Sequence, residues 1–398
     1  MLRKKAPRKG QPAKRGGVLL VGLLPPPPGG VQSITGLIWD SPLRAQYNMH
    51  LFDIRNSRGP EWSGRFDWPN FKNAGGQFIR CARLLRQQRP KVFHSPIAPS
   101  LSGSLRDLAL LWLGKTHGSY TIGHCHGDSS SIALYERSPR WRKATFRLLL
   151  RGADHLIVLS PYWARHYKRL APHAVITILP NAVRPEFLAC DHRPHADRPD
   201  PFRIVFVGAI GKRKGVHDLV DAAAMLRRIM APPQGLVVRV VGAEESSGQL
   251  DDVVRRVRGR RLGDVVTFVG PKYGDELLSE LRDADVFVLP SHNEGQPVAL
   301  LEAMATGSCV VSTSIPPIAE VVTDGTDGRL VPPGDAYALA AVLASLYEDG
   351  ALRHAYGRMA AATVRGRFTA DTFLQRIDDV YSAVVAPENG AARGLTKR

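Results

Sequence analysis

The sequence predicts an α/β protein with two parallel-sheet domains. Short apolar segments that suit buried strands alternate with segments that suit helices, which is typical of a parallel sheet covered by helices on both faces. A stretch rich in proline and charge, residues 191–202, separates two such series and is the predicted linker. The 398 residues are enough for two hydrophobic cores of ordinary size. We therefore expect one domain at residues 17–190 and a second at residues 203–368.

The first domain begins with an apolar strand at residues 18–24, followed by a proline turn. Gly29 and Gly30 then open a helix, and glycine at such a turn lets the backbone approach a ligand closely. Residues 46–72 are polar and aromatic, and no element is assigned to them. Later strands are expected at 90–94, 120–127, 154–160 and 177–181, and helices at 78–87, 105–113 and 140–151.

The second domain repeats this alternation more regularly. Strands are expected at 203–207, 236–241, 265–269 and 285–289, and helices at 215–230, 249–258, 274–282, 336–348 and 351–364. A final amphipathic helix is expected at 369–386. Residues 1–16 and 387–398 are predicted to be disordered tails.

Residues 285–313 indicate a strand, a polar loop, a helix and a second strand. Pro297 suits the first helical position, and Gly307 suits the helix end. The N-terminus of such a helix offers free N–H groups to a diphosphate. Glu302, inside the helix, could bind a vicinal diol such as a ribose, and Glu294, in the loop, could bind hydroxyls of a sugar. This order fits a nucleotide-sugar. The alternative is an ordinary strand–helix–strand unit with a capping Glu294 and a surface Glu302.

Three consecutive cations, residues 212–214, stand between the strand at 203–207 and the following helix. The glycines around them, which include Gly208, are not spaced as in the dinucleotide-binding fingerprint. Cations at a helix entrance can bind a diphosphate and stabilise the charge that builds on it as it leaves. The alternative is a solvated turn without a ligand.

The string EGQPVALLEAMATG resembles the EX7E signature of glycosyltransferase family 4, because seven residues separate Glu294 from Glu302. Where the family commonly has Phe-Gly, this chain has Gln296 and Pro297. The resemblance implies retaining enzymes with the GT-B fold, in which two Rossmann-like domains face a central cleft. It also implies that the first domain lies on the acceptor side and that the second binds the nucleotide-sugar. The helix at 369–386 would cross back to the first domain.

The resemblance implies a glycosyltransferase of the EC 2.4 class that needs no metal and no cofactor. The implied catalytic residues are Glu294, Lys214 and His126, and His124 receives no role. The implied donor-binding residues are Gly29, Gly30, Gly208, Arg213, Lys214, Glu294, Gly295, Gln296, Pro297, Val298, Leu301 and Glu302.

One position departs from the family pattern. The family usually has Arg where this chain has Ala209, and Arg213 or Lys212 could supply the missing charge. If neither does, the chain is a catalytically impaired relative that binds a nucleotide-sugar. A metal site at His124 and His126 is disfavoured, since no second pair of ligands stands elsewhere in the sequence.

The net charge of +18 indicates an acidic partner or counter-ions. The tail at 1–16 and the cations of Arg140–Arg151 could bind an anionic membrane surface; the alternatives are a solubilising tail and a solvated helix face. The expected acceptor is a lipid-linked intermediate or a growing polysaccharide. Nucleic acid is disfavoured, because no binding motif accompanies the charge. Four cysteines without a C-x-x-C pair, and no apolar run near the ~20 residues of a membrane span, predict a cytoplasmic protein, with peripheral binding to the inner face of the membrane left open.

Overall fold

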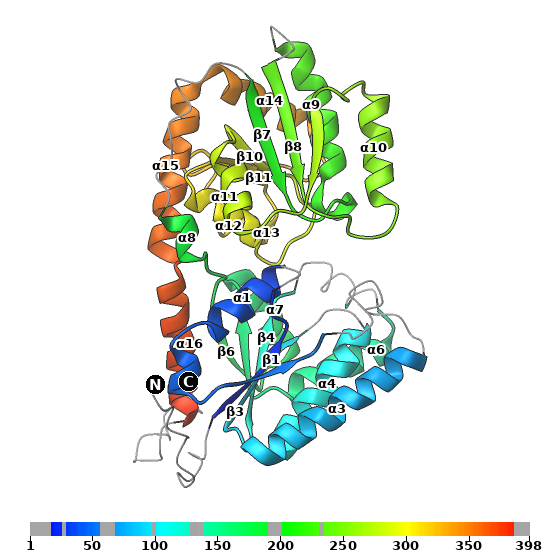
Figure 1. Cartoon of the computed structure of the whole chain (residues 1–398), viewed down its shortest axis with the longest axis vertical. Coiled ribbons are helices and arrows are strands. Elements are labelled where there is room, and N and C mark those ends of the chain that lie inside the picture. Colours follow the sequence, from blue (N-terminus) through cyan, green and yellow to red (C-terminus); the bar gives the residue numbers. More distant parts are fainter. Residues whose placement is uncertain are drawn as a thin grey trace, which may run out of the picture.

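The computed structural model describes residues 17–25, 29–55, 68–97, 101–127, 135, 138–189, 201–230 and 235–385. It contains two α/β domains, each with a six-stranded sheet whose neighbouring strands are all parallel (Figure 1). The predicted class of two Rossmann-like parallel-sheet domains is confirmed. Both predicted tails lie outside the described residues, and so does the linker except for its last two positions.

The N-terminal sheet has the strand order β2-β1-β3-β4-β5-β6. Its strands are β1 (Val18–Gly22), β2 (His50–Asp53), β3 (Val92–Ile97), β4 (Tyr120–Cys125), β5 (His155–Val158) and β6 (Val175–Ile178). Its helices are α1 (Gly30–Trp39), α2 (Leu43–Gln46), α3 (Trp68–Gln88), α4 (Leu101–Thr116), α6 (Arg140–Arg151), α7 (Pro161–Leu170) and α8 (Pro185–Leu188). Because parallel strands end at the same edge, Gly29 after β1 and His126 after β4 both lie at the carboxyl edge of this sheet.

The C-terminal sheet has the strand order β12-β11-β10-β7-β8-β9. Its strands are β7 (Phe202–Val207), β8 (Leu236–Val241), β9 (Val266–Gly270), β10 (Val286–Leu289), β11 (Cys309–Thr313) and β12 (Arg329–Val331). Its helices are the 3-10 turn η3 (Lys212–Lys214), α9 (Val216–Ile229), α10 (Gln249–Gly259), α11 (Gly274–Arg282), α12 (Val298–Ala305), α13 (Pro316–Ala319), α14 (Ala336–Glu348) and α15 (Gly350–Arg367). The order reverses between β7 and β10, and ligands of such sheets bind where the order reverses.

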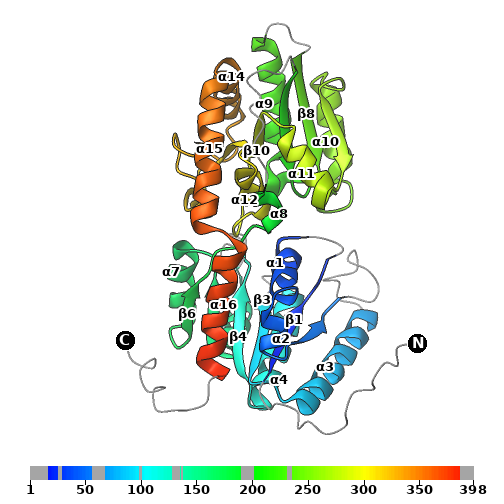
Figure 2. The same cartoon turned by 60° about the vertical axis from the view of Figure 1, so that its left-hand side comes forward.

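The last helix, α16 (Ala370–Val385), lies against the N-terminal domain although it follows the C-terminal domain in sequence (Figures 1 and 2). Its Phe373, Ile377 and Tyr381 are buried in one apolar cluster with side chains of the N-terminal sheet. The chain crosses between the domains where Val183 N donates to the carbonyl oxygen of Phe368 at 2.9 Å. The core of the first domain is therefore completed by a helix that follows the second domain in sequence.

Several predicted boundaries shift by a few residues, and three differences are larger or bear on the site. The helix predicted at 78–87 extends over Trp68–Gln88 as α3, because packing along α4 outweighs the low helix propensity of Gly75 and Gly76. The strand β2 lies in the stretch to which the sequence assigned no element. Pro297 is the N-cap of α12, with an extended ψ of 116°, rather than its first helical residue.

Candidate active site between the two domains

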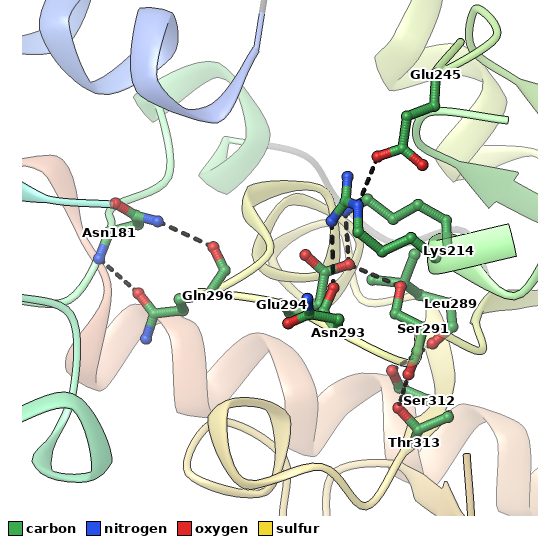
Figure 3. A network of polar contacts seen from close by, with 11 residues as sticks. Asn181, Lys214, Glu245, Leu289, Ser291, Asn293, Glu294, Gln296, Ser312 and Thr313 are labelled. Carbon is green, nitrogen blue, oxygen red and sulfur yellow. Dashed lines mark hydrogen bonds and ion pairs between the residues drawn. The ribbon is translucent and has the colours of Figure 1, made fainter. Parts of the chain in front are cut away.

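A lysine–glutamate ion pair lies at the centre of the candidate site. Lys214 ends the turn η3, and Glu294 lies in the loop between β10 and α12. Lys214 Nζ is 2.6 Å from Glu294 Oε1, and the two side chains are 15% and 5% exposed (Figure 3). Such a sheltered pair is less screened by water than a pair on the surface. The structure therefore brings together two of the three residues predicted to be catalytic.

Gly215 allows Lys214 to come close to the loop that carries Glu294. It has a φ of +69°, and a Cβ at this position would lie 1.9 Å from the carbonyl oxygen of Pro290. Only glycine satisfies both conditions. The turn at Gly215 therefore sets the end of η3 directly against the end of β10.

Ser291 fixes the orientation of the glutamate. Its Oγ donates to Glu294 Oε1 at 2.7 Å, and Thr313 Oγ1 donates to the carbonyl oxygen of Ser291 at 2.5 Å (Figure 3). Both contacts to the carboxylate fall on Oε1. Among the residues that the structure describes, Glu294 Oε2 has no such partner and can accept hydrogen bonds from a ligand.

Arg213 is a second cation beside this pair. Its Nε donates to Glu245 Oε1 at 2.5 Å, and its Nη1 donates to the carbonyl oxygen of Asn293 at 3.2 Å. Lys212, in contrast, is exposed. Of the two cations that could compensate for Ala209, Arg213 is therefore the one held against the loop that carries Glu294.

The N-terminus of α12 opens beside the ion pair. No side chain caps this helix, so the N–H groups of its first turn can bind an anion. The glycine turn of the other domain faces this point, since a Cβ on Gly30 would lie 3.6 Å from Val298 Cγ2. The structure thus brings the predicted Gly29–Gly30 turn to the predicted diphosphate site.

Glu302 lies further along α12, towards α8. Burial raises the pKa of its carboxyl to about 8; Arg184 acts in the opposite direction, and Glu186 adds to the rise. Glu302 is consequently protonated at neutral pH in the protein without a ligand. A group in this state can both donate and accept hydrogen bonds.

The two domains touch backbone to backbone at Gly295. A Cβ at this position would lie 2.2 Å from the carbonyl oxygen of Gly127, which leaves room only for glycine. Trp163 Nε1, from α7 of the N-terminal domain, donates to the carbonyl oxygen of Gly295 at 2.9 Å. The loop that carries Glu294 is therefore fixed by contacts with both domains.

Gln296 adds a second tie between the domains. Asn181 N donates to Gln296 Oε1 at 2.6 Å, and Asn181 Nδ2 donates to the carbonyl oxygen of Gln296 at 3.0 Å (Figure 3). Both residues are buried, so neither bond competes with bulk water. Gln296, which stands where the family commonly has Phe, thus holds the first domain against the loop.

His126 follows β4, and its carbonyl oxygen would lie 3.1 Å from a Cβ on Gly295. Burial lowers the pKa of its imidazole to about 4, so the ring is neutral at pH 7. The ring stacks on His124 with 4.0 Å between the ring centroids. The predicted catalytic histidine therefore approaches the Glu294 loop from the opposite domain, uncharged.

Two predicted donor-binding residues have roles in the fold. Leu301 is fully buried in the core of the C-terminal domain, so its side chain offers no surface to a ligand. Gly208 packs on Phe206 and lies beside Lys214, since a Cβ at this position would be 3.3 Å from Phe206 Cζ and 3.9 Å from Lys214 Cδ. Ser291, Trp163 and Asn181 belong to the site but were not predicted from the sequence. Ser291 lies two positions after the buried strand β10, which was a signal that could have indicated it.

No group of three or more His, Cys, Asp or Glu side chains among the described residues could hold a metal ion. No helix of the described part of the chain is long and apolar enough to cross a membrane.

Two protein families match successive parts of the chain. The family described as Glycosyltransferase Family 4 matches residues 40–187, and the family described as Glycosyl transferases group 1 matches residues 190–363. The chain belongs to the group 1 glycosyltransferases. The resemblance noted at the Glu294 motif is thereby confirmed as family membership.

Curated relatives agree with this family. The chain is 32% identical over 341 residues to the D-inositol 3-phosphate glycosyltransferase of Pseudarthrobacter chlorophenolicus, which covers 76% of this chain and 78% of the relative. It is also 32% identical over 273 residues to the putative colanic acid biosynthesis glycosyltransferase WcaL of Salmonella typhimurium, which covers 66% of this chain and 63% of the relative.

Solved structures share the fold of this glycosyltransferase. Sucrose-phosphate synthase from Thermosynechococcus elongatus has a TM-score of 0.75 at 20% identity and covers 92% of this chain and 98% of its own. Anabaena HepE in complex with UDP has a TM-score of 0.71 at 16% identity and covers 92% of this chain and 100% of its own. The protein therefore has the predicted GT-B fold.

Proposed function

We propose that this glycosyltransferase moves a sugar from a nucleoside-diphosphate-sugar to a hydroxyl acceptor and retains the configuration at the anomeric carbon. The observation that carries the proposal is the sheltered Lys214–Glu294 pair beside the uncapped start of α12. The lysine and the helix N-terminus supply positive charge for a diphosphate, and the carboxylate suits neutral hydroxyls. The UDP bound to HepE supports this class of ligand.

The mechanism begins with the departure of the nucleoside diphosphate. As the bond from the anomeric carbon to the phosphate oxygen breaks, Lys214 and Arg213 stabilise the charge that builds on the phosphate. Glu302 holds the ribose, Glu294 positions the donor sugar, and the neutral His126 hydrogen-bonds a sugar hydroxyl from the other domain. The acceptor oxygen forms the new bond from the face that the phosphate leaves, and the phosphate takes the acceptor proton.

The alternative is a relative that binds nucleotide-sugars without transferring the sugar, and Ala209 is its basis. The contact between Arg213 and the carbonyl oxygen of Asn293 favours an active enzyme, because it places a guanidinium one residue from Glu294. We propose that Arg213 leaves Glu245 for the diphosphate when the donor binds. The proposed transfer needs no metal, since Lys214, the released Arg213 and the N-terminus of α12 would together supply positive charge for the phosphate.

The test is release of nucleoside diphosphate from a panel of nucleotide-sugars, with and without a chelator. Slow hydrolysis of one donor, equal in both conditions, is the expected result. Loss of release with the chelator would remove metal independence from the proposal. Donor binding without release, in the presence of a wide set of acceptors, would support the impaired relative instead.

We propose that the acceptor is a lipid-linked or polysaccharide intermediate met at the inner face of a membrane. The helices α3, α4 and α6 lie side by side on one flank of the N-terminal domain (Figure 1). Trp141 and Leu148 on α6 are 59% and 45% exposed, and Ile79 on α3 is 62% exposed. The cations of α6 are Arg140, Arg142, Lys143, Arg147 and Arg151, and α3 adds Lys72, Arg80, Arg83 and Arg86. Neither helix has a carboxylate, and this composition suits an anionic bilayer.

A further inference from the structure

Three histidines form a row inside the N-terminal domain. His94 lies on β3, His124 on β4, and His126 directly after β4. The ring centroids are 5.4 Å apart between His94 and His124 and 4.0 Å apart between His124 and His126. His94 and His124 are each only 2% exposed, so neither can reach a substrate by itself.

The row is connected to α16 by hydrogen bonds. Tyr381 Oη lies 2.6 Å from His94 Nδ1, and His94 Nε2 lies 3.3 Å from His124 Nδ1. Tyr381 is fully buried, and 287 positions of sequence separate it from His94. We call these three residues, Tyr381, His94 and His124, the tyrosine–histidine chain.

The number of unsatisfied buried groups decides which atoms donate and which accept in the tyrosine–histidine chain. Within the described residues, Tyr381 Oη has His94 as its hydrogen-bond partner, and His124 Nε2 has none. If Tyr381 donates, His94 carries its proton on Nε2 and donates to His124, and the one unsatisfied group is the His124 Nε2–H. If the direction is reversed, the buried Tyr381 O–H and the His124 Nε2 lone pair are both unsatisfied. Because each unsatisfied buried group costs free energy, the first arrangement is favoured.

We propose that the tyrosine–histidine chain positions His126. The packing of α16, which carries Tyr381, would then control the part of the active site that contacts the donor sugar. The tyrosine fixes the tautomer of His94, and His94 fixes the tautomer and ring plane of His124. His126 packs on that plane, so its own ring is held before a substrate arrives. This inference rests on the proposed function of His126, and the three residues of the chain act as positioning residues.

The test compares Tyr381→Phe with Tyr47→Phe as a matched control. Tyr47 lies edge-on to Tyr381, with 5.4 Å between centroids, and its Oη donates to Asp378 of the same helix at 2.5 Å. Each variant therefore loses one hydroxyl that holds α16, but Tyr381→Phe alone breaks the tyrosine–histidine chain. The measurements are the ring 15N NMR signals of the three histidines, assigned with single His→Gln variants, and kcat and donor KM.

The expected result is specific to Tyr381→Phe. The ring signals of His94, His124 and His126 change, and kcat falls about threefold with little change in donor KM, because a small displacement of a positioned group costs rate rather than binding. Tyr47→Phe leaves the ring signals and the ratio of kcat to KM as in the wild type. Equal behaviour of the two variants, or altered ring signals with unchanged kcat, would overturn the inference.

The NMR measurement separates this inference from the proposed function. If the wild type releases no nucleoside diphosphate from any donor, the proposed function fails. The His126 signals still report whether the loss of the Tyr381 hydroxyl moves that ring. Unchanged His126 signals in Tyr381→Phe would then overturn the positioning role, and changed signals in this variant alone would support it.

Discussion

The carboxyl edges of the two sheets meet at the same site, but they are chemically opposite. The carboxyl edge of the sheet in the C-terminal domain carries charged pairs, Lys214 with Glu294 and Arg213 with Glu245. The carboxyl edge of the N-terminal sheet carries His126, and His94 lies behind it inside the sheet; burial lowers the pKa of His126 to about 4 and that of His94 to about 3. One wall of the site is therefore ionic, and the other is polar but neutral at pH 7.

This difference suggests how the two domains divide the work in the proposed reaction. The departing diphosphate develops negative charge, which only the ionic wall can stabilise. The sugar hydroxyls are neutral, and a neutral imidazole can donate or accept a hydrogen bond without attracting the phosphate. A charged His126 would draw the phosphate across the site, and burial prevents that charge from forming.

The sharpest way to break the comparison is to remove one group from each wall. Lys214→Ala should lower kcat about 100- to 1,000-fold, the usual effect of losing one charge-stabilising group. His126→Gln should lower it only about 3- to 10-fold, because it replaces one neutral hydrogen-bonding group by another. Single-turnover release of nucleoside diphosphate measures both. Equal losses would show that the walls do not differ in function.

The two domains are also expected to differ at their surfaces, because the cationic flank of α3 and α6 in the N-terminal domain is the proposed membrane-binding surface. Arg140→Ala with Arg147→Ala should weaken binding to vesicles of phosphatidylcholine and phosphatidylglycerol about 30-fold, since each cation near an anionic surface contributes about 1 kcal/mol. The control is Arg255→Ala with Arg258→Ala, which removes two cations from α10 of the other domain. Sedimentation at low salt measures the difference, and equal weakening by both pairs would contradict a specific α6 surface.

The N-terminal domain also contains a histidine at the opposite, amino edge of its sheet, and the burial of this side chain predicts how stability depends on pH. Burial lowers the pKa of His155 on β5 to about 4, and its Nε2 lies 2.8 Å from Thr177 Oγ1. The unfolded chain binds the proton near pH 6.5, so stability is present above that pH and is lost as the pH falls towards 4. Between pH 7 and 5 this single group should cost about 2 kcal/mol, a factor of about 20 to 30 in the folding equilibrium. His155→Gln should remove that part of the slope.

Tryptophan fluorescence is suited to this measurement. All six tryptophans lie in the N-terminal domain, at positions 39, 62, 68, 112, 141 and 163. Urea unfolding followed at these side chains therefore reports on the domain with the neutral wall. An unchanged slope in His155→Gln would mean that His155 does not titrate differently in the folded and unfolded states.

The smallest expected effect concerns Glu302, the carboxyl of the C-terminal domain whose pKa is raised to about 8. Ribose hydroxyls donate best to the ionised form, so donor binding should release a proton. Affinity for UDP should then rise about tenfold from pH 7 to 9, a range in which the phosphate, with a pKa near 6, is already ionised. Calorimetry measures this, and Glu302→Gln should abolish the rise. The exposed Glu348→Gln is the control and should keep it.

The C-terminal half of the site could be predicted from the sequence because its residues lie in short local motifs. Glu294, Glu302 and Lys214 lie in two short strings that each end a strand and begin a helix, and the fold class followed from the same alternation. The first domain resisted prediction because its contacts join distant positions. The hydrogen bonds between Gln296 and Asn181 join residues 115 positions apart, so no local sequence pattern predicts them.

His124 shows why local patterns miss such residues. By sequence it is one of two histidines in a strand, and it received no role. Its proposed role depends on Tyr381 of α16, which lies far from it in sequence and is connected to it by hydrogen bonds through His94. Ser291 is a different case: its contact with Glu294 is only three positions away, but a serine in a loop has no pattern of its own that shows which side chain it orients.

The return of α16 has a consequence for the order in which the protein is made. The apolar cluster of the first domain contains Phe373, Ile377 and Tyr381, which the ribosome adds only after the whole second domain. Domains usually fold as they emerge, but this one must wait for about 200 further residues, or roughly 10 to 40 seconds at ribosomal rates. During that interval the second domain can complete its sheet while the first stays open on the face that α16 will cover. The domain synthesised first is therefore the one finished last.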